Sequence, residues 1–307
     1  IRNIRLQKLE KLRSLGIDPY PSKYSRDFIT IDLARKSQKE VDVVGRLWSF
    51  REHGNVIFAD LRDASGQIQL MFQKKTLGDN FKTLKLIDTG DFLGVSGKII
   101  TTQAGEITVD VLSFELLTKT LRPMPDSWEG LDDIEERFRR RYLDIMVNPG
   151  IKELFERKSK FWEVNRQLLK DRGFIQVETP ILENVTGGAD ARPFITHHNA
   201  LDQDFFLRIS TELYLKRLVG AGFEKVFTLG PNFRNEGIDD EHLPEYYQVE
   251  WYWAYADYRS NMRLTQEMFR YIAQKVYGKT EFSTHGHKFD LADDWIEIDY
   301  TKSIKDN

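Results

Sequence analysis

Charged side chains run through one of the most aromatic stretches of the sequence, NFRNEGIDDEHLPEYYQVEWYWAYADY from Asn232 to Tyr258. Two apolar and aromatic runs flank a polar turn, and this pattern predicts a strand, a loop and a second strand. Because side chains alternate between the two faces of a strand, Asn232, Arg234 and Glu236 are expected on one face. On the second strand, one face is expected to carry Gln248, Glu250 and Tyr252, and the opposite, core-side face Val249, Trp251 and Trp253.

A hairpin of this kind brings one arginine and two carboxylates together. One interpretation is a solvated outer face with ion pairs between the strands. The surrounding Trp, Tyr and Phe side chains favour a partly buried sheet instead. Since a buried charge costs several kcal/mol unless it is paired or bound, the stretch indicates either internal ion pairs or a charged ligand.

Composition limits the classes of protein to which the chain can belong. Its 307 residues suffice for about two ordinary domains with hydrophobic cores. Hydrophobic residues make up 40% and charged residues 30%, which is typical of a soluble globular protein. No apolar run approaches the roughly 20 residues of a membrane span, and the first residues, IRNIRLQKLEKLRSLG, lack a secretory signal, so we expect a cytoplasmic protein. The absence of cysteine excludes disulfides, thiolate zinc sites and a cysteine nucleophile.

The net charge of −3 gives no overall signal for nucleic-acid binding, so such a partner would depend on local basic patches. One candidate patch lies in the N-terminal segment, residues 1–36, which is expected to begin with a helix that Gly16 and Pro19 end. Its basic residues would either be solvated or meet a phosphate backbone. They are Arg2, Arg5, Lys8, Lys11 and Arg13.

Five short β-rich runs follow within residues 37–120, several of them separated by glycine-containing turns. This density of strands predicts a small antiparallel barrel, and the five-stranded OB-fold is the obvious candidate. Such barrels often bind single-stranded nucleic acid by stacking bases on aromatic side chains beside a basic groove. Arg51, Phe58 and Gln69 are candidates for this role. The alternative for Phe58 is a place in the core.

Residues 121–150 are rich in proline, glycine and charge and are expected to join two domains. In the second domain, residues 151–307, helical periodicity ends at Gly173, and FIQVETPIL reads as a strand closed by Pro180. The run FFLRISTELYLKRLVGAGF then predicts a strand that leads into a helix. A helix followed by antiparallel strands indicates an α+β fold and not the alternating order of a Rossmann domain.

Several of these blocks carry a family resemblance. GFIQVETPIL resembles the first signature motif of class II aminoacyl-tRNA synthetases, and FRNEG resembles the opening of the second. GGADARPFITHHNALDQDFFLRISTELYLKRL and RNEGIDDEHLPEYYQVEWYWAYADY resemble the bacterial-type lysyl-tRNA synthetases within that class. The resemblance extends over nearly the entire chain. It implies an OB-fold anticodon-binding domain followed by an antiparallel-sheet catalytic domain.

The resemblance also implies an activity, the ATP-dependent activation of lysine and its transfer to tRNA(Lys). Arg234 matches the family arginine that bridges the amino-acid carboxylate and the α-phosphate, where negative charge accumulates. Glu236 and His242 match positions around ATP, and Tyr246 matches an aromatic residue stacked on adenine. The alternative for His242 is an ordinary loop histidine.

The matching lysine site must meet two ammonium groups with acceptors. Glu212, near Gly188, matches the α-amino site, and Glu250 with Tyr252 matches the end that receives the ε-ammonium. Arg51, Phe58 and Gln69 match the anticodon-reading face of the barrel. Lysine anticodons are rich in uridine, whose edge needs both donors and acceptors, and an amide side chain supplies both.

Two departures limit what the resemblance implies. The family commonly has asparagine directly after the loop histidine, where this sequence has Leu243. No segment before Asn307 resembles the third class II motif, and the acidic residues expected to hold Mg²⁺ would lie beyond Asn307. We therefore expect a partial catalytic domain, without metal ligands of its own.

In the class II family the helix and strand of the first motif form a two-fold interface. The segment from Ile151 to Leu182 is therefore expected to support a homodimer, with Phe161 in an aromatic stripe and Pro180 reaching towards the partner. The alternative is that the aromatic side chains pack within one subunit. Two other functions stay open, an aspartyl- or asparaginyl-type synthetase and a non-catalytic fragment that binds tRNA or dimerises.

Overall fold

The computed structural model describes residues 1–124, 131–148, 150–237, 239 and 242–306. It divides the chain into two compact units, Ile1–Asn148 and Pro149–Asn307, which are treated separately below. The expected join at 121–150 lies partly outside the described residues. Its described part contains two short helices, α5 (Ile134–Arg139) and α6 (Arg141–Val147).

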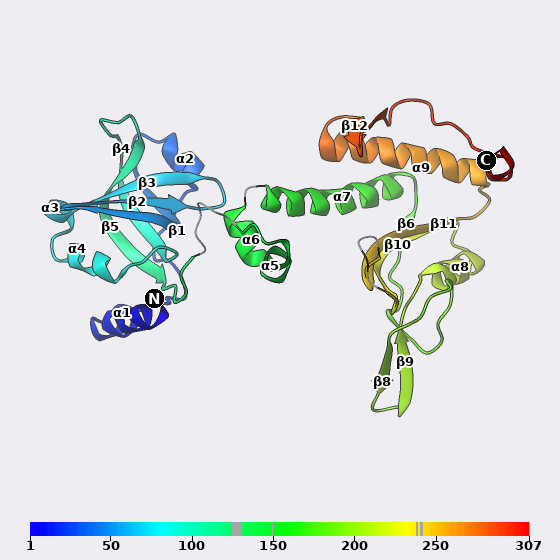
Figure 1. Cartoon of the computed structure of the whole chain (residues 1–307), viewed down its shortest axis with the longest axis horizontal. Helices are drawn as coiled ribbons and strands as arrows, with labels where there is room; N and C mark the ends of the chain where they lie inside the picture. Colours follow the sequence, from blue (N-terminus) through cyan, green and yellow to red (C-terminus); the bar gives the residue numbers. More distant parts are fainter. Residues whose placement is uncertain (125–130, 149, 238, 240–241, 307) are drawn as a thin grey trace. The chain divides into compact units, whose positions relative to one another are not determined.

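A closed five-stranded barrel forms the centre of the first unit, in the order β1-β2-β3-β5-β4 (Figure 1). Neighbouring strands are antiparallel except for the parallel pair β3 and β5. Closure leaves no open sheet edge, and the predicted OB-fold barrel is confirmed. The strands are β1 (Glu40–His53), β2 (Val56–Arg62), β3 (Gln67–Gln73), β4 (Phe92–Thr101) and β5 (Ile107–Thr118).

Alternating burial along these strands fills the barrel with Val, Leu, Ile, Ala and Phe side chains. Short helices lie beside it, of which α2 contacts β1 and β3 and α3 contacts β3 and β5. One of them, α2, was not expected from the sequence; it begins after Thr30, whose hydroxyl accepts the N–H of Leu33 at 3.5 Å. The helices are α2 (Ile31–Arg35), α3 (Lys74–Leu77), α4 (Asn80–Thr83) and the 3₁₀ helix η1 (Leu84–Leu86).

The N-terminal helix α1 (Arg2–Ser14) forms as predicted, with Leu9 and Leu12 buried. The expectation that its basic residues are either solvated or free for phosphate is wrong for two of them. Arg5 is only 6% exposed and donates to the backbone carbonyls of Thr89, Thr120 and Arg122 at 2.9 to 3.2 Å.

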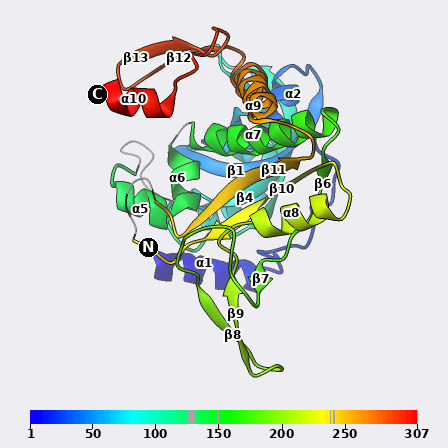
Figure 2. The same ribbon diagram turned by 90° about the vertical axis from the view of Figure 1, so that its right-hand side faces the viewer.

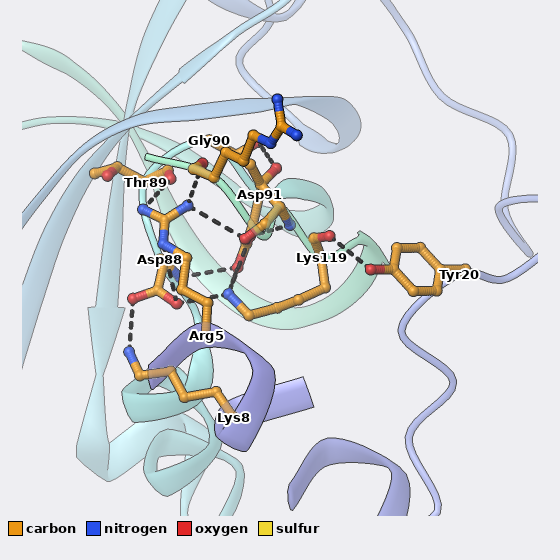
Figure 3. Close-up of polar contacts among 10 residues, drawn as sticks. Arg5, Lys8, Tyr20, Asp88, Thr89, Gly90, Asp91 and Lys119 are labelled. Carbon is orange, nitrogen blue, oxygen red and sulfur yellow. Dashed lines mark hydrogen bonds and ion pairs between the residues drawn. The ribbon is translucent and has the colours of Figure 1, made fainter. Parts of the chain in front are cut away.

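Figure 3 shows the charges beneath this helix. Lys8 donates to Asp88 at 2.6 Å, and the fully buried Lys119 donates to Asp88 at 2.6 Å and to Asp91 at 2.8 Å. Burial raises the pKa of Asp91 in spite of the hydrogen bonds from Lys119. Burial also acts on Asp88, but the bonds from Lys119 and Lys8 outweigh it and lower the pKa of that carboxyl. This network could not be predicted from the sequence, because its members come from segments up to 117 residues apart.

In the second unit, a three-stranded sheet has the order β11-β10-β6. The helices α7 and α9 lie side by side over one of its faces (Figures 1 and 2). Their buried side chains, including Leu168 and Met268, pack against Phe227 of the sheet. The elements are α7 (Ile151–Asp171), β6 (Ile175–Gln176), β10 (Lys225–Phe233), β11 (Glu245–Trp253) and α9 (Tyr258–Ile272), which continues into the π-helix η2 (Ala273–Tyr277).

A smaller sheet and a helix complete the surroundings of the hairpin. Helix α8 contacts β10 and β11. The sheet has the order β7-β9-β8, and a further hairpin pairs β12 with β13. These elements are β7 (Leu182–Glu183), β8 (Ile195–His198), β9 (Gln203–Leu207), α8 (Glu212–Gly220), β12 (Glu281–Thr284), β13 (His287–Asp290) and α10 (Tyr300–Asp306).

The expected continuous strand over FIQVETPIL is wrong. Only β6 and β7 are strands, and the chain between them lies outside any sheet. Pro180 has no N–H for a sheet ladder, and the carbonyl of Thr179 instead accepts a hydrogen bond from the Arg208 side chain at 3.0 Å. Among the described residues, no helix is both long and apolar enough for a membrane crossing.

Candidate functional site

The hairpin of β10 and β11 separates a core face from a polar face. Val249, Trp251 and Trp253 pack against the core of the second unit, as their alternation predicted. The other face carries Gln248 opposite Gly230 and Glu250 opposite Thr228. The prediction for the first strand needs correction, because β10 ends at Phe233. The residues Arg234 and Glu236 therefore follow the strand, although the N–H of Arg234 still donates to the Pro244 carbonyl at 2.9 Å.

A chain of hydrogen bonds holds Glu250 on this polar face. The hydroxyl of Thr211 donates to Oε2 of Glu250 at 2.7 Å, and Nε2 of Gln248 donates to the same oxygen at 3.2 Å. Nδ2 of Asn232 in turn donates to Oε1 of Gln248 at 2.7 Å. Oδ1 of the fully buried Asn232 has no partner among the described residues. We call Thr211, Asn232, Gln248 and Glu250 the Glu250 relay.

The predicted α-amino site lies next to this relay. Gly188 has a φ of +86°, and a Cβ there would lie 2.9 Å from Oγ of Ser210 and 3.0 Å from Cβ of Glu212. Only glycine fits this backbone and this close approach. Glu212 accepts hydrogen bonds from Lys216 and from the Tyr252 hydroxyl. Burial, with the nearby carboxylates of Glu212 and Glu250, raises the pKa of Tyr252.

The predicted ATP residues are only partly brought together. The Arg234 guanidinium lies 5.3 Å from the centre of the Tyr246 ring, and its Nε is buried without a partner in the described part of the chain. Glu236 accepts the N–H of Arg192 at 3.3 Å. His242 is exposed and lies 2.8 Å from the Asp239 carboxylate.

The loop beyond these residues departs from the family pattern at Leu243, whose side chain is 62% exposed. Positions 238, 240 and 241 of the quoted stretch lie outside the described residues.

Arg208 borders the candidate site but was not predicted from the sequence. It is 3% exposed and donates to the Pro231 carbonyl at 2.8 Å and to the Thr179 hydroxyl at 2.7 Å. Burial lowers the pKa of this arginine. Its position as the single charge in the apolar run FFLRIS was the available signal. Burial likewise raises the pKa of the nearby Glu183, against the opposing effect of Arg208.

On the barrel, the predicted nucleic-acid residues share the outer face. Phe58 lies between the buried Ile57 and Ala59 of β2, so its side chain points outwards, and it is not part of the barrel core. In the β1–β2 ladder Arg51 stands directly opposite Phe58. The His53 ring lies edge-on to Phe58 at 6.3 Å between centroids.

The polar groups beside Phe58 already have partners within the barrel. Arg51 lies 3.6 Å from Asp60. Gln69 is 8% exposed, donates to Glu106 at 2.8 Å and accepts from the Thr108 hydroxyl at 2.9 Å. A base that bound here would have to exchange with these contacts.

Of the two residues predicted for a dimer interface, Phe161 faces the core and Pro180 faces solvent. Phe161 packs against the core and contacts the Trp162 ring at 5.0 Å, while Trp162 contacts Tyr247 at 4.8 Å. These aromatic contacts lie within the subunit. Pro180 is exposed, as are several apolar side chains of the same segment. They are Leu154, Phe155, Ile175, Ile181 and Leu182.

Comparison with known proteins places the chain. Residues 133–307 match the tRNA synthetases class II (D, K and N). The chain belongs to this family. Residues 41–117 match the OB-fold nucleic acid binding domain, in agreement with the barrel.

The relatives found include lysine–tRNA ligases. The enzyme of Carboxydothermus hydrogenoformans is 44% identical over 308 residues, which cover 99% of this chain and 63% of the relative. Those of Thermoanaerobacter sp. (strain X514) and Clostridium perfringens (strain 13) are 45% and 44% identical over 309 residues, with 99% of this chain and 62% of each relative covered. The resemblance seen in the sequence is thereby confirmed. The chain spans somewhat less than two thirds of the length of these relatives.

Proposed function

We propose that the chain belongs to a lysine–tRNA ligase. This enzyme would form lysyl-adenylate and pyrophosphate from lysine and ATP, and then transfer the lysyl group to tRNA(Lys). The observation that carries the proposal is the polar face of the hairpin. There the Glu250 relay holds a carboxylate on β11, and Arg234, whose Nε has no partner among the described residues, follows directly after β10.

Activation requires an oxygen of the lysine carboxylate to attack the α-phosphorus while the bond to pyrophosphate breaks. Negative charge then increases on the α-phosphoryl oxygens, and a fixed guanidinium stabilises it. We assign this role to Arg234, whose planar fork suits both carboxylate and phosphate. Tyr246, beside that guanidinium, is proposed to stack on adenine, and Glu236 and His242 to contact ATP.

The substrate side is assigned by charge. Glu212, packed against Gly188, would accept from the α-ammonium group, and Glu250 with Tyr252 from the ε-ammonium group. An aspartyl- or asparaginyl-type enzyme would need a cation or amide donors here instead. Arg208 is a cation on this side of the sheet, but its guanidinium donates to Pro231 and Thr179. This arrangement favours a cationic substrate.

Magnesium commonly accompanies ATP in phosphoryl-group chemistry. Among the described residues, no group of three or more His, Cys, Asp or Glu side chains is arranged to hold a metal ion. These described residues therefore form no metal site of their own, and we assign no step to one.

For tRNA, we propose that the outer face of the barrel reads the anticodon. Phe58 would stack on a base, while Arg51 and Gln69 contact it. The match to nucleic-acid-binding OB-folds and the outward position of Phe58 support this assignment.

We further propose a homodimer through residues 151–182. The support is the exposed apolar side chains on this segment, including Phe155 at 47% and Leu182 at 50%. Light scattering at micromolar concentration should give twice the subunit mass, and Phe155→Glu should shift it to the subunit mass. A native protein of subunit mass would contradict the dimer. Because Phe161 packs inward, Phe161→Glu would test folding and not the interface.

The activity is tested by lysine-dependent exchange of pyrophosphate into ATP, with this chain and with the full-length protein. We expect exchange that requires lysine and that aspartate or asparagine does not support. Glu250→Gln should weaken lysine far more than ATP, because a charged acceptor for a buried ammonium group is lost. Exchange driven by aspartate, or equal shifts in the lysine and ATP constants, would contradict the proposal.

A further inference from the structure

Thr211 stands where a helix cap is expected but does not cap. It is the residue before the first turn of α8, a position at which threonine normally accepts a backbone N–H of that turn. Its side chain makes no such bond, and its hydroxyl instead donates to Oε2 of Glu250 at 2.7 Å. Thr211 is 2% exposed, so this contact is shielded from water.

Only one assignment of donors and acceptors is consistent with the hydrogen bonds of the Glu250 relay. An ionised carboxylate only accepts, so Gln248 must present its NH₂ group to Glu250 and its oxygen to Asn232. Asn232 must then donate through Nδ2, which leaves its Oδ1 as an acceptor. The unpartnered buried oxygen of Asn232 is thus a consequence of the relay and not of a reversed amide.

The relay also treats the two oxygens of Glu250 differently. Among the described residues, both hydrogen bonds that Glu250 receives end on Oε2. Oε1 is left to accept from a ligand, on the face that also holds the buried Oδ1 of Asn232, which has no partner among the described residues. The Lys216 ammonium group, which lies 6.0 Å from the centre of the Tyr252 ring, is paired with Glu212. An ammonium ligand carries three donors and suits acceptors of this kind.

We propose that Thr211 and Gln248 are positioning residues that make the site selective for a substrate side chain ending in an ammonium group. They hold Glu250 by Oε2 and turn Oε1 towards that group. This inference rests on the proposed function, because it takes Glu250 as the acceptor of the side-chain ammonium. Neither residue touches the substrate; each acts through the orientation of Glu250.

The test is calorimetric binding of lysine, ATP and norleucine to the full-length protein. Norleucine has the lysine side chain without its ammonium group, and its weak binding is measured by competition. Thr211→Val removes the donor, and Thr211→Ser retains it. We expect Thr211→Val to weaken lysine about tenfold, since the donor serves a charged acceptor, and to leave ATP and norleucine unchanged. Thr211→Ser should bind lysine as the native protein does.

A second variant, Gln248→Met, removes the longer bond and should weaken lysine less than Thr211→Val does. The inference is overturned if Thr211→Val binds lysine normally, or if it loses lysine and norleucine equally, as a distorted pocket would. A native protein that binds lysine no better than norleucine would instead refute the proposed function, and the inference with it.

Discussion

Arg5 in the first unit is a buried residue and Arg234 in the second has a buried Nε, but the two guanidinium groups have different surroundings. Arg5 donates to three backbone carbonyls. Arg234 keeps a buried Nε with no partner among the described residues and lies over an aromatic ring. Buried polar groups are nearly always satisfied in folded proteins, so each exception calls for an explanation. The three hydrogen bonds of Arg5 account for its burial, because they hold helix α1 in place. No described contact accounts for the buried Nε of Arg234.

The carboxylates repeat the contrast. Asp91 beneath α1 accepts from Lys119 and from two backbone N–H groups, whereas the described contacts of Glu250 use one oxygen. In the described part of the chain, four buried side-chain atoms lack a hydrogen-bond partner, and three belong to the second unit: Glu183, Asn232 and Arg234. The fourth belongs to Arg46, whose guanidinium lies 4.5 Å from the centre of the Phe92 ring. We infer that the first unit uses its buried charges for stability and the second keeps some for ligands.

We expect the largest effect from a substitution that breaks the buried ion-pair network of Lys119 beneath α1. Lys119→Met leaves Asp91 buried without its cation and should lower the free energy of unfolding of the first unit by about 3–5 kcal/mol. Urea unfolding measures it. As a control, Lys82→Met removes an exposed ion pair with Asp79 and should leave stability nearly unchanged. Equal effects of the two substitutions would mean that the buried network has no special role.

Arg234→Ala should impair activity, whereas Lys119→Met impairs stability. We expect the activation free energy of adenylate formation to rise by roughly 3 kcal/mol or more, because a preorganised donor at the developing phosphate charge is lost. Stability should change little. Arg259→Ala, which removes an exposed arginine paired with Glu297, serves as the control with native exchange rates. If Arg234→Ala exchanges pyrophosphate at the native rate, the assignment of the ATP site is wrong.

On the barrel, Phe58→Ala should cost about 1–3 kcal/mol of tRNA affinity through lost base stacking. Pyrophosphate exchange should be unaffected. Filter binding at fixed salt measures the affinity, and Phe28→Ala, which removes another exposed aromatic ring of the first unit, should bind tRNA normally. An unfolded Phe58→Ala protein would show that the ring is needed for packing after all.

The smallest expected effect is on how the stability of the first unit depends on pH. Burial alone would raise the pKa of Asp63, but hydrogen bonds from the N–H of Ile31, from Ser65 and from the N–H of Gly66 lower it. A carboxyl whose pKa is lowered by folding stabilises the fold above its unfolded value, which is about 4, and loses that contribution as the pH falls. The first unit should therefore lose stability below about pH 4, and Asp63→Asn should flatten this dependence. An unchanged slope of unfolding free energy against pH would exclude Asp63 as the cause.

Much of the fold follows from local pattern. Periodic spacing of apolar residues predicted the five strands of the barrel, helix α7 and the alternation along β11. The short strands β6 and β7 were not separable, because the backbone between them is held by Arg208, which is remote in sequence. Tertiary contact, not propensity, decides such segments.

The candidate site also contains residues that the sequence indicated and others that it did not. Family motifs pointed to Glu212, Arg234 and Glu250, whose charges suit the substrates that we propose. They did not identify Thr211, since a threonine before a helix reads as a cap. Its hydroxyl reaches Glu250 only because α8 contacts the hairpin, an arrangement that spacing along the chain does not encode.

Amide hydrogen exchange of the full-length protein, with and without lysine and ATP, tests the contrast between the two units most directly. If the open polar atoms of the second unit are ligand groups, the ligands should slow exchange along Glu245–Trp253 and in the first turn of α8. Exchange in the barrel strands, Glu40–Thr118, should stay unchanged. Unaltered exchange along Glu245–Trp253, or equal slowing throughout the barrel, would contradict the account.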